Sequence, residues 1–212
     1  MAVGKLTRGQ RIILATGNRG KLREIQSLLG DAWILIPQSD LGIDPAEENG
    51  ATFVENAVIK ARHAAAHSGL PAIADDSGLE VDALHGAPGI RSARYAGQFG
   101  QGADAANNAK LLAELAGVPA ANRSARFRCV IAFVRDADDA APVIAEGTWE
   151  GRIATRCSGE NGFGYDPLFI DLESGLTGGQ LDPEQKNLCS HRGVALGRLC
   201  EVLEAMMGPE SS

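Results

Sequence analysis

The hydrophobic pattern in the first half of the chain alternates between short apolar runs and amphipathic segments. The apolar runs have the length of buried strands and lie at Arg11–Ala15, Trp33–Pro37 and Ala72–Ala74. A helix is predicted after the first run, and a second from Thr52 to Ala66, where Thr52 and Glu55 form a capping box. This order favours an α/β fold, in which helices cover a sheet.

The second half continues the alternation and adds a different strand pattern. Asp104–Ala116 predicts a helix with its leucines on the inner face. Ala125–Phe133 has the period of a strand, and Val143–Ala154 follows it after a turn as the returning strand. Since these two strands form an antiparallel pair, the sheet is expected to be mixed. A last helix runs to Met206 from Ser190, which is placed to cap it.

Two adjacent carboxylates, Asp75 and Asp76, follow the third apolar run. Neighbouring side chains in a regular strand point to opposite faces, so both can face one pocket only where the strand breaks. The Ser77–Gly78 pair is a turn signal, and we expect it to end the strand there. A solvated acidic turn is the alternative. The Gly- and Pro-rich segment His85–Gly97 carries arginines and a tyrosine, which favours a functional loop.

Composition places the chain among globular proteins and excludes one class of partner. The 212 residues suit a single domain, 1–212, with residues 1–10 and 208–212 as flexible ends. A formal net charge of -7 argues against a nucleic-acid-binding surface, because such a surface needs a basic face. An anionic substrate would therefore need locally concentrated cations or a metal ion.

The four cysteines show neither the paired spacing of a metal site nor a compact disulfide framework. This pattern favours reduced thiols and a cytoplasmic location. No apolar run approaches the length of a membrane span, and the N-terminal residues lack the core of a signal peptide. We therefore expect a protein that binds neither nucleic acid nor membrane.

The segment Thr16–Lys21, with the sequence TGNRGK, connects the first strand to the first helix. A glycine-bearing turn before a helix presents free backbone N–H groups at the positive end of the helix dipole, and Lys21 adds a full charge. This layout predicts a phosphate site, although its spacing is not that of the standard nucleotide-binding loop. An ordinary turn with an exposed lysine is the alternative.

A glycine-rich loop, Gly159–Ile170, leads into another strand. Phe163 and Tyr165 flank Gly164 in this loop, and an aromatic pair there could clamp a nucleobase by stacking. A core aromatic residue beside a flexible turn is the alternative interpretation.

Basic side chains gather around the start of the last helix. Lys186 precedes the helix, and His191 and Arg192 lie in its first turn. Cations at a helix start oppose the preference of the helix dipole, and local conflicts of this kind are typical of functional sites.

The loop Ser39–Gly50 is acidic, and most of its carboxylates are expected to face solvent. Glu47 or Glu48 could instead reach the Asp75–Asp76 turn as a metal ligand. Carboxylate oxygens are the ligands that Mg²⁺ prefers.

Four motifs follow one another in order along nearly the whole chain. They are TGN-x-x-K at Thr16–Lys21, ADDSGLEVDAL-x-G-x-PG at Ala74–Gly89, GFGYDP at Gly162–Pro167 and K-x4-HR at Lys186–Arg192. The TFVENA segment at Thr52–Ala57 accompanies them. In this combination the chain resembles the inosine triphosphate pyrophosphatase family, the Ham1-like or RdgB-like group of noncanonical purine nucleoside triphosphatases.

The resemblance implies an enzyme that hydrolyses dITP, ITP and XTP to the nucleoside monophosphate and pyrophosphate, with Mg²⁺ as cofactor. It also implies a homodimer. The fold it implies is α/β, an elongated mixed β-sheet flanked by helices, with two lobes and a central cleft that holds the active site.

By position, the resemblance implies that Asp76 is the catalytic residue and a metal ligand and that Ser77 contacts the substrate. It places a second metal ligand in the acidic loop, where Glu47 is favoured over Glu48 because of its spacing to Gly50. The residues implied to hold phosphates are Thr16, Gly17, Asn18, Arg19, Gly20, Lys21 and Lys186. Those implied to hold and read the base are Phe163, Gly164, Tyr165, Asp166, His191 and Arg192.

Two other hypotheses remain open from the sequence. A related Maf-type pyrophosphatase would act on modified pyrimidine triphosphates, but the GFGYDP and HR elements match the purine group. A nucleotide sensor without catalytic activity would need no general base, so Asp76 and the acidic loop favour the enzyme.

Overall fold

The computed structural model describes residues 7–29 and 32–207. Residues 1–6 and 208–212, which belong to the predicted flexible ends, lie outside the described residues. The side chains of Arg19, Arg23 and Leu28 lie outside them as well.

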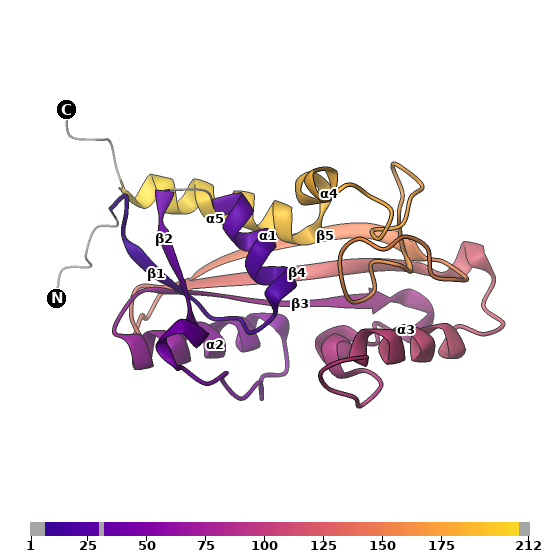
Figure 1. The fold of residues 1–212 in the computed structure, drawn as a ribbon, viewed down its shortest axis with the longest axis horizontal. Helices are drawn as coiled ribbons and strands as arrows, with labels where there is room; N and C mark the ends of the chain where they lie inside the picture. Colours follow the sequence, from indigo (N-terminus) through magenta and orange to yellow (C-terminus); the bar gives the residue numbers. More distant parts are fainter. Residues whose placement is uncertain (1–6, 30–31, 208–212) are drawn as a thin grey trace. The chain divides into compact units, whose positions relative to one another are not determined.

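Within this part of the chain, six strands form one mixed sheet in the order β2-β1-β3-β4-β5-β6 (Figure 1). The first strand, β1, runs parallel to both of its neighbours, whereas β5 and β6 are antiparallel. The mixed sheet expected from the sequence is therefore confirmed. The strands are β1 (Arg11–Leu14), β2 (Ile34–Pro37), β3 (Ala72–Val81), β4 (Ser124–Val134), β5 (Val143–Ile153) and β6 (Phe169–Asp171).

The α-helices agree with the predicted periodicity, with one addition. The short helix α4 covers the segment around Lys186, where the sequence predicted no helix. Within residues 7–29 and 32–207, none of the helices is long and apolar enough to cross a membrane. The helices are α1 (Arg19–Leu29), α2 (Phe53–Ser68), α3 (Ala103–Glu114), α4 (Pro183–Cys189) and α5 (His191–Met207).

The chain divides into two compact units. Unit 1 comprises the residues up to Asp76, Val130–Glu146 and the residues from Val194 on. Unit 2 comprises Ser77–Cys129 and Gly147–Gly193. They correspond to the two lobes that the resemblance implies, while the single functional domain and the central cleft stay predictions.

The core of unit 1 forms where helix α2 packs on β1. Ile12, Ile13 and Leu14 of β1 are fully buried because the strand has a neighbour on each side and a helix against it. Small side chains make up most of the buried face of α2 and let the helix approach the sheet closely: Ala57, Ala61, Ala64 and Ala65.

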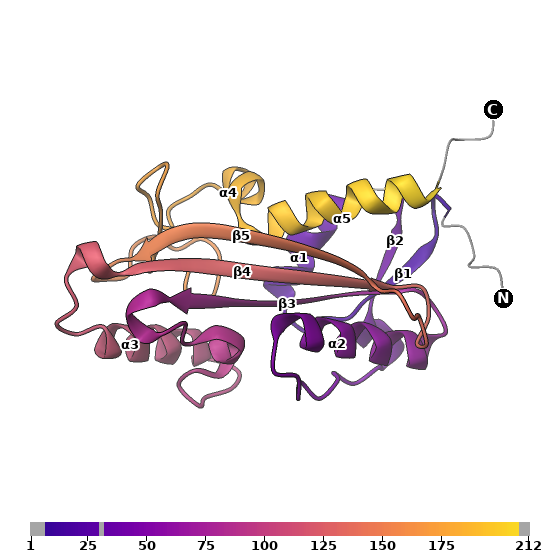
Figure 2. The ribbon, with the colours of Figure 1, turned by 180° about the vertical axis from the view of Figure 1, so that it is seen from behind.

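The core of unit 2 is aromatic. Phe127 of β4 and Trp149 of β5 stack with their ring centroids 6.1 Å apart, and Phe169 packs against both rings. Leu111 and Leu115 from the predicted helix are fully buried in this cluster. Figure 2 shows the long strands β4 and β5 that carry its first two rings.

The central strand differs from the prediction at its most informative position. β3 does not end before Ser77 but continues for 10 residues, from Ala72 to Val81. Ser77 and Gly78 are therefore strand residues and not a turn. The turn preference of a Ser-Gly pair is weak, and a strand with neighbours on both edges overrides it.

The start of α2 offers a test of the predicted capping box. Thr52 Oγ1 accepts a hydrogen bond from the Glu55 backbone N–H at 3.1 Å, and the Glu55 carboxylate accepts one from the Ala51 N–H at 2.7 Å. We expect Thr52→Ala to lower the free energy of unfolding by about 1 kcal/mol, because it leaves a helix N–H without its partner. Urea denaturation measures this loss. Thr52→Ser keeps the hydroxyl and should stay close to wild type, and equal stability of the alanine variant would contradict the cap.

Candidate active site

The uninterrupted strand β3 places Asp75 and Asp76 on opposite faces of the sheet, and each finds a lysine there. Lys21, from the first turn of α1, lies with Nζ 2.8 Å from Asp75 Oδ2. Lys60, from the middle of α2, lies with Nζ 2.9 Å from Asp76 Oδ1. Figure 1 shows α1 and α2 on opposite sides of β3. Because a buried charge is costly without a partner, both pairings stabilise the ionised carboxylates.

Lys60 is a functional candidate that the sequence analysis missed. Its Nζ lies 2.9 Å from Glu48 Oε1 as well as from Asp76, so one ammonium joins two carboxylates. Asn56, one turn earlier on α2, donates to Asp76 Oδ2 at 3.3 Å. The sequence did contain an indication of this role, because Asn56 and Lys60 lie four residues apart on α2, beside its buried alanines. We call Lys21, Glu48, Lys60, Asp75 and Asp76 the carboxylate cluster.

The electrostatics of this cluster favour a basic carboxylate. Burial raises the pKa of Asp76 above its usual range, and attraction to Lys60 and Lys21 offsets only part of that rise. Burial alone would lower the pKa of Lys60, but the nearby carboxylates, with Asp76 foremost, outweigh burial and raise it. Lys60 therefore stays protonated at neutral pH, and the Asp76 carboxylate binds a proton more readily than an exposed aspartate does.

The acidic loop contributes Glu48 to the cluster, and Glu47 is exposed. The geometry thus favours Glu48 over Glu47 as the second metal ligand, contrary to the choice made from spacing. Among the described residues, no group of three or more His, Cys, Asp or Glu side chains forms a metal cage. Two carboxylates fit Mg²⁺ nonetheless, since this ion usually binds one or two carboxylates together with substrate phosphates. The Lys60 ammonium shows that the position between them accepts a cation.

The predicted phosphate segment forms the expected junction between β1 and α1, but several of its N–H groups are bonded within the segment. Asn18 Oδ1 accepts hydrogen bonds from the N–H groups of Gly20 at 2.8 Å and of Lys21 at 3.1 Å, and so caps the helix. Thr16 Oγ1 accepts from the Asn18 N–H at 3.2 Å, and Gly17 is exposed. The anion affinity predicted for this segment would therefore come from the charge of Lys21 more than from free amides. The side chain of Arg19 lies outside the described residues.

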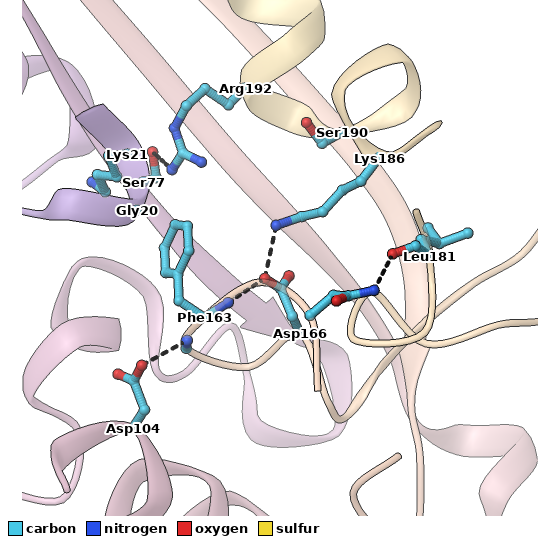
Figure 3. A network of polar contacts seen from close by, with 12 residues as sticks. Gly20, Lys21, Ser77, Asp104, Phe163, Asp166, Leu181, Lys186, Ser190 and Arg192 are labelled. Carbon is cyan, nitrogen blue, oxygen red and sulfur yellow. Dashed lines mark hydrogen bonds and ion pairs between the residues drawn. The ribbon is translucent and has the colours of Figure 1, made fainter. Parts of the chain in front are cut away.

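A second cluster lies in unit 2 and brings Phe163, Asp166, Lys186 and Arg192 together (Figure 3). Lys186 Nζ donates to Asp166 Oδ2 at 2.7 Å, and both side chains are almost fully buried. The same Asp166 oxygen accepts the Phe163 N–H at 2.8 Å. The Phe163 ring lies 5.1 Å from Lys186 Nζ and 5.6 Å from Arg192 Cζ, within reach of cation–π attraction. We call these four residues the arginine–phenylalanine cluster.

The two basic residues at the start of α5 have different surroundings. Arg192 is buried, and its Nη2 donates to Ser77 Oγ at 3.3 Å. His191 stacks on Phe127 with ring centroids 4.7 Å apart and an interplanar angle of 11°, as part of the aromatic core. Ser190 Oγ accepts the Gly193 N–H at 3.1 Å, which confirms the predicted cap. The helix start thus directs one basic side chain toward Phe163 and the other into the core.

Tyr165 corrects the expected aromatic pair. Its ring belongs to the hydrophobic core of unit 2 and is only 4% exposed, and its hydroxyl donates to the Ser92 carbonyl at 2.9 Å. Desolvation by burial also raises the pKa of this hydroxyl, which holds it in the neutral donor form. Of the two predicted aromatic residues, Phe163 alone stays partly exposed, and Gly164, between them in the sequence, is partly buried as well.

Comparisons with known proteins point to one family. The model of the Ham1 family matches residues 12–202. The chain is 59% identical over 195 residues to a dITP/XTP pyrophosphatase of Thioalkalivibrio sulfidiphilus, an alignment that covers 92% of this chain and 98% of the relative. It is 56% identical over 200 residues to a dITP/XTP pyrophosphatase of Methylococcus capsulatus, which covers 94% and 98% of the two chains.

Solved structures give the same result for the fold. A HAM1 protein from Coxiella burnetii superposes with a TM-score of 0.85 at 49% identity, over 92% of this chain and 99% of that one. The Staphylococcus aureus Ham1 protein superposes with a TM-score of 0.81 at 41% identity, over 92% and 99%. The α/β fold predicted from the sequence is therefore confirmed.

The coupling between Lys60 and Asp76 can be measured directly. We expect Lys60→Met to raise the pKa of Asp76 further, because it removes the strongest attraction that opposes the effect of burial. Methionine keeps most of the apolar stem, and ¹³C NMR of the Asp76 carboxyl carbon follows the titration. Lys110→Met, which removes a lysine from α3, serves as the control and should leave the titration unchanged. A pKa that stays constant or falls in Lys60→Met would contradict the pairing.

Proposed function

Because the chain belongs to the Ham1 family, we propose that it hydrolyses noncanonical purine nucleoside triphosphates such as dITP, ITP and XTP to the monophosphate and pyrophosphate. Relatives at 59% and 56% identity, aligned over nearly the whole chain, bear the name dITP/XTP pyrophosphatase. The observation that carries the chemistry is the buried, raised-pKa carboxylate of Asp76 between a lysine and an asparagine.

Hydrolysis at the α-phosphorus requires a water molecule that loses a proton as it attacks. The water oxygen forms a bond to the α-phosphorus, the bond from that phosphorus to the bridging oxygen breaks, and the bridging oxygen leaves as part of pyrophosphate. Asp76 accepts the proton of the water. A raised pKa makes this carboxylate a better base, since general-base catalysis is most effective when the pKa approaches the working pH.

Cations stabilise the charge that accumulates on the departing pyrophosphate. Lys21 and Lys60 are each held by a carboxylate at 2.8 and 2.9 Å, so their ammonium groups are oriented before substrate arrives. Preorganised charges of this kind contribute to catalysis because they need no rearrangement in the transition state. In this proposal Thr16–Lys21 bind the phosphates, and Lys186 assists them.

We place Mg²⁺ in the same proposal, with Asp76 and Glu48 as its protein ligands and the substrate phosphates as the others. The ion would neutralise phosphate charge and polarise the phosphorus–oxygen bonds. Both carboxylates already share one cation, Lys60, which supports their ability to hold a second one when a triphosphate adds its own negative charge.

The arginine–phenylalanine cluster is proposed to bind the base. The Phe163 ring offers a stacking surface, and Arg192 has only hydrogen-bond donors. Hypoxanthine and xanthine carry a carbonyl oxygen at position 6, which such donors satisfy, whereas adenine carries an amino group there. His191 and Ser77 are also proposed to contribute to the base side, because His191 precedes Arg192 on α5 and Ser77 accepts a hydrogen bond from Arg192.

Assembly and location complete the proposal. We propose a homodimer in the cytoplasm. Phe99 is 80% exposed and Leu188 82% exposed, and an interface between two copies would remove such apolar side chains from water. The cysteine pattern suits a reducing compartment.

Release of pyrophosphate tests the function. We expect the wild-type protein to release it from dITP and XTP with Mg²⁺, far faster than from dTTP or dATP. Asp76→Asn should lower kcat for dITP by about a hundredfold or more, since it removes the base and one metal ligand. A thermal melt controls for folding. If a folded Asp76→Asn variant kept near wild-type turnover, Asp76 would not be the base. If the wild-type protein released no pyrophosphate from dITP, the proposed function would be refuted.

Base choice tests Arg192 separately. We expect Arg192→Ala to lower kcat/KM for dITP by about tenfold or more while kcat/KM for dATP stays low, because the variant loses a donor to the 6-keto oxygen and gains nothing for adenine. The ratio of the two kcat/KM values therefore falls. Arg156→Ala, which removes an exposed arginine elsewhere in unit 2, is the control. An unchanged ratio in Arg192→Ala would mean that the base is read elsewhere.

A further inference from the structure

One glycine, Gly164, lies in the loop that carries Phe163 and Asp166 of the arginine–phenylalanine cluster. Gly164 has a φ of +60°, a left-handed conformation that a glycine adopts without strain. It connects Phe163 on one side with Tyr165 and Asp166 on the other. Since glycine is the most flexible residue, its two dihedral angles must be fixed by contacts if the residues on both sides are to keep their positions.

Helix α3 supplies these contacts with two side chains one turn apart. Asp104 Oδ2 accepts a hydrogen bond from the Gly164 N–H at 2.8 Å (Figure 3). Asn108 Nδ2 donates to the Gly164 carbonyl at 2.9 Å. The N–H belongs to the peptide before the Gly164 Cα and the carbonyl to the peptide after it, so the two bonds fix both planes. Residues at i and i+4 on a helix lie on one face, which gives the pair its spacing.

The held peptides lead directly to the side chains of the cluster. Phe163 is bonded to the first peptide, and its own N–H donates to Asp166 Oδ2 at 2.8 Å. That oxygen also accepts from Lys186 Nζ at 2.7 Å. A rotation of either peptide at Gly164 would therefore move the Phe163 ring relative to Lys186 and Arg192. Asp104 and Asn108 each bond to Gly164, so we expect their effect on the cluster to pass through this residue.

We propose that Asp104 and Asn108 are positioning residues of the base site, which hold the Gly164 peptides so that Phe163 stands ready to stack on a purine. This inference rests on the proposed function for its ligand, a nucleotide with a 6-keto purine base. The two side chains act in opposite senses, one as an acceptor and the other as a donor. Isosteric exchanges at the two positions therefore have different expected results.

The experiment compares Asp104→Asn with Asn108→Asp. The first variant keeps an oxygen acceptor for the Gly164 N–H, and the second places a carboxylate oxygen against the Gly164 carbonyl in place of the donor. We expect the Kd for deoxyinosine monophosphate, measured by calorimetry, to stay within about twofold for Asp104→Asn and to rise about tenfold for Asn108→Asp. Asp104→Ala should raise it as Asn108→Asp does, and its rescue by asparagine separates a hydrogen bond from a charge effect.

Inorganic pyrophosphate is the second probe, because it lacks a base. Its Kd should be the same in all variants if α3 acts on the base site alone. Glu114→Gln, on the same helix but in contact with Tyr95 and Lys110, is the control for helix charge. The inference would be overturned if Asn108→Asp bound the nucleotide as tightly as wild type, or if the variant lost affinity for the nucleotide and for pyrophosphate to the same degree. It would also be overturned if the wild-type protein did not bind the nucleotide. If the binding results were as expected but the wild-type protein did not hydrolyse dITP, the proposed hydrolysis would be refuted and the positioning role of α3 would stand.

Discussion

The alternation of side chains along β3 is the constraint on which the carboxylate cluster depends. Two adjacent aspartates in an uninterrupted strand cannot share a face, so each must be neutralised by a helix that covers its own side of the sheet. Lys21 meets Asp75 from α1, and Lys60 meets Asp76 from α2. The need to pair two buried charges thus orients the two lysines to which the proposed function assigns a role.

The two members of the Lys60–Asp76 pair contribute to stability in different pH ranges. The pKa of Asp76 is raised in the folded state, so ionisation of this carboxyl opposes folding. The stability that the protonated carboxyl provides is fully present below its unfolded pKa of about 3.9 and is lost as the pH rises through the folded pKa. The pKa of Lys60 is raised too, and its contribution is fully present below an unfolded pKa of about 10.4. At neutral pH the protonated lysine therefore opposes the destabilisation that comes from keeping a basic carboxylate buried.

Local patterns predicted the elements well but not the long-range contacts. The strands of the sheet, the cap at Thr52 and the cap at Ser190 follow from residues close in sequence, and all three are present. The break expected at Ser77–Gly78 failed because hydrogen bonding with neighbouring strands outweighs a local turn preference. Lys60 was missed because a helical lysine usually faces solvent, and its carboxylate partners are 12 and 16 residues away. Tyr165 could not be separated from Phe163 without knowing which ring the core would take.

The register of β3 connects these points. Leu14 pairs with Ile73 and Ile13 with Ala72 in the parallel ladder, which sets the faces on which the next residues lie. A slip of one residue would exchange the faces of Asp75 and Asp76 and give the Lys60 side a different carboxylate. The apolar run before the aspartates, buried on both faces, does not by itself distinguish the two registers. The residues after the aspartates do, because Leu79 and Val81 lie in the core of unit 2 and a slip would turn Glu80 to that face instead. The observed register therefore meets two demands at once: it buries Leu79 and Val81, and it pairs the two aspartates with lysines from different helices.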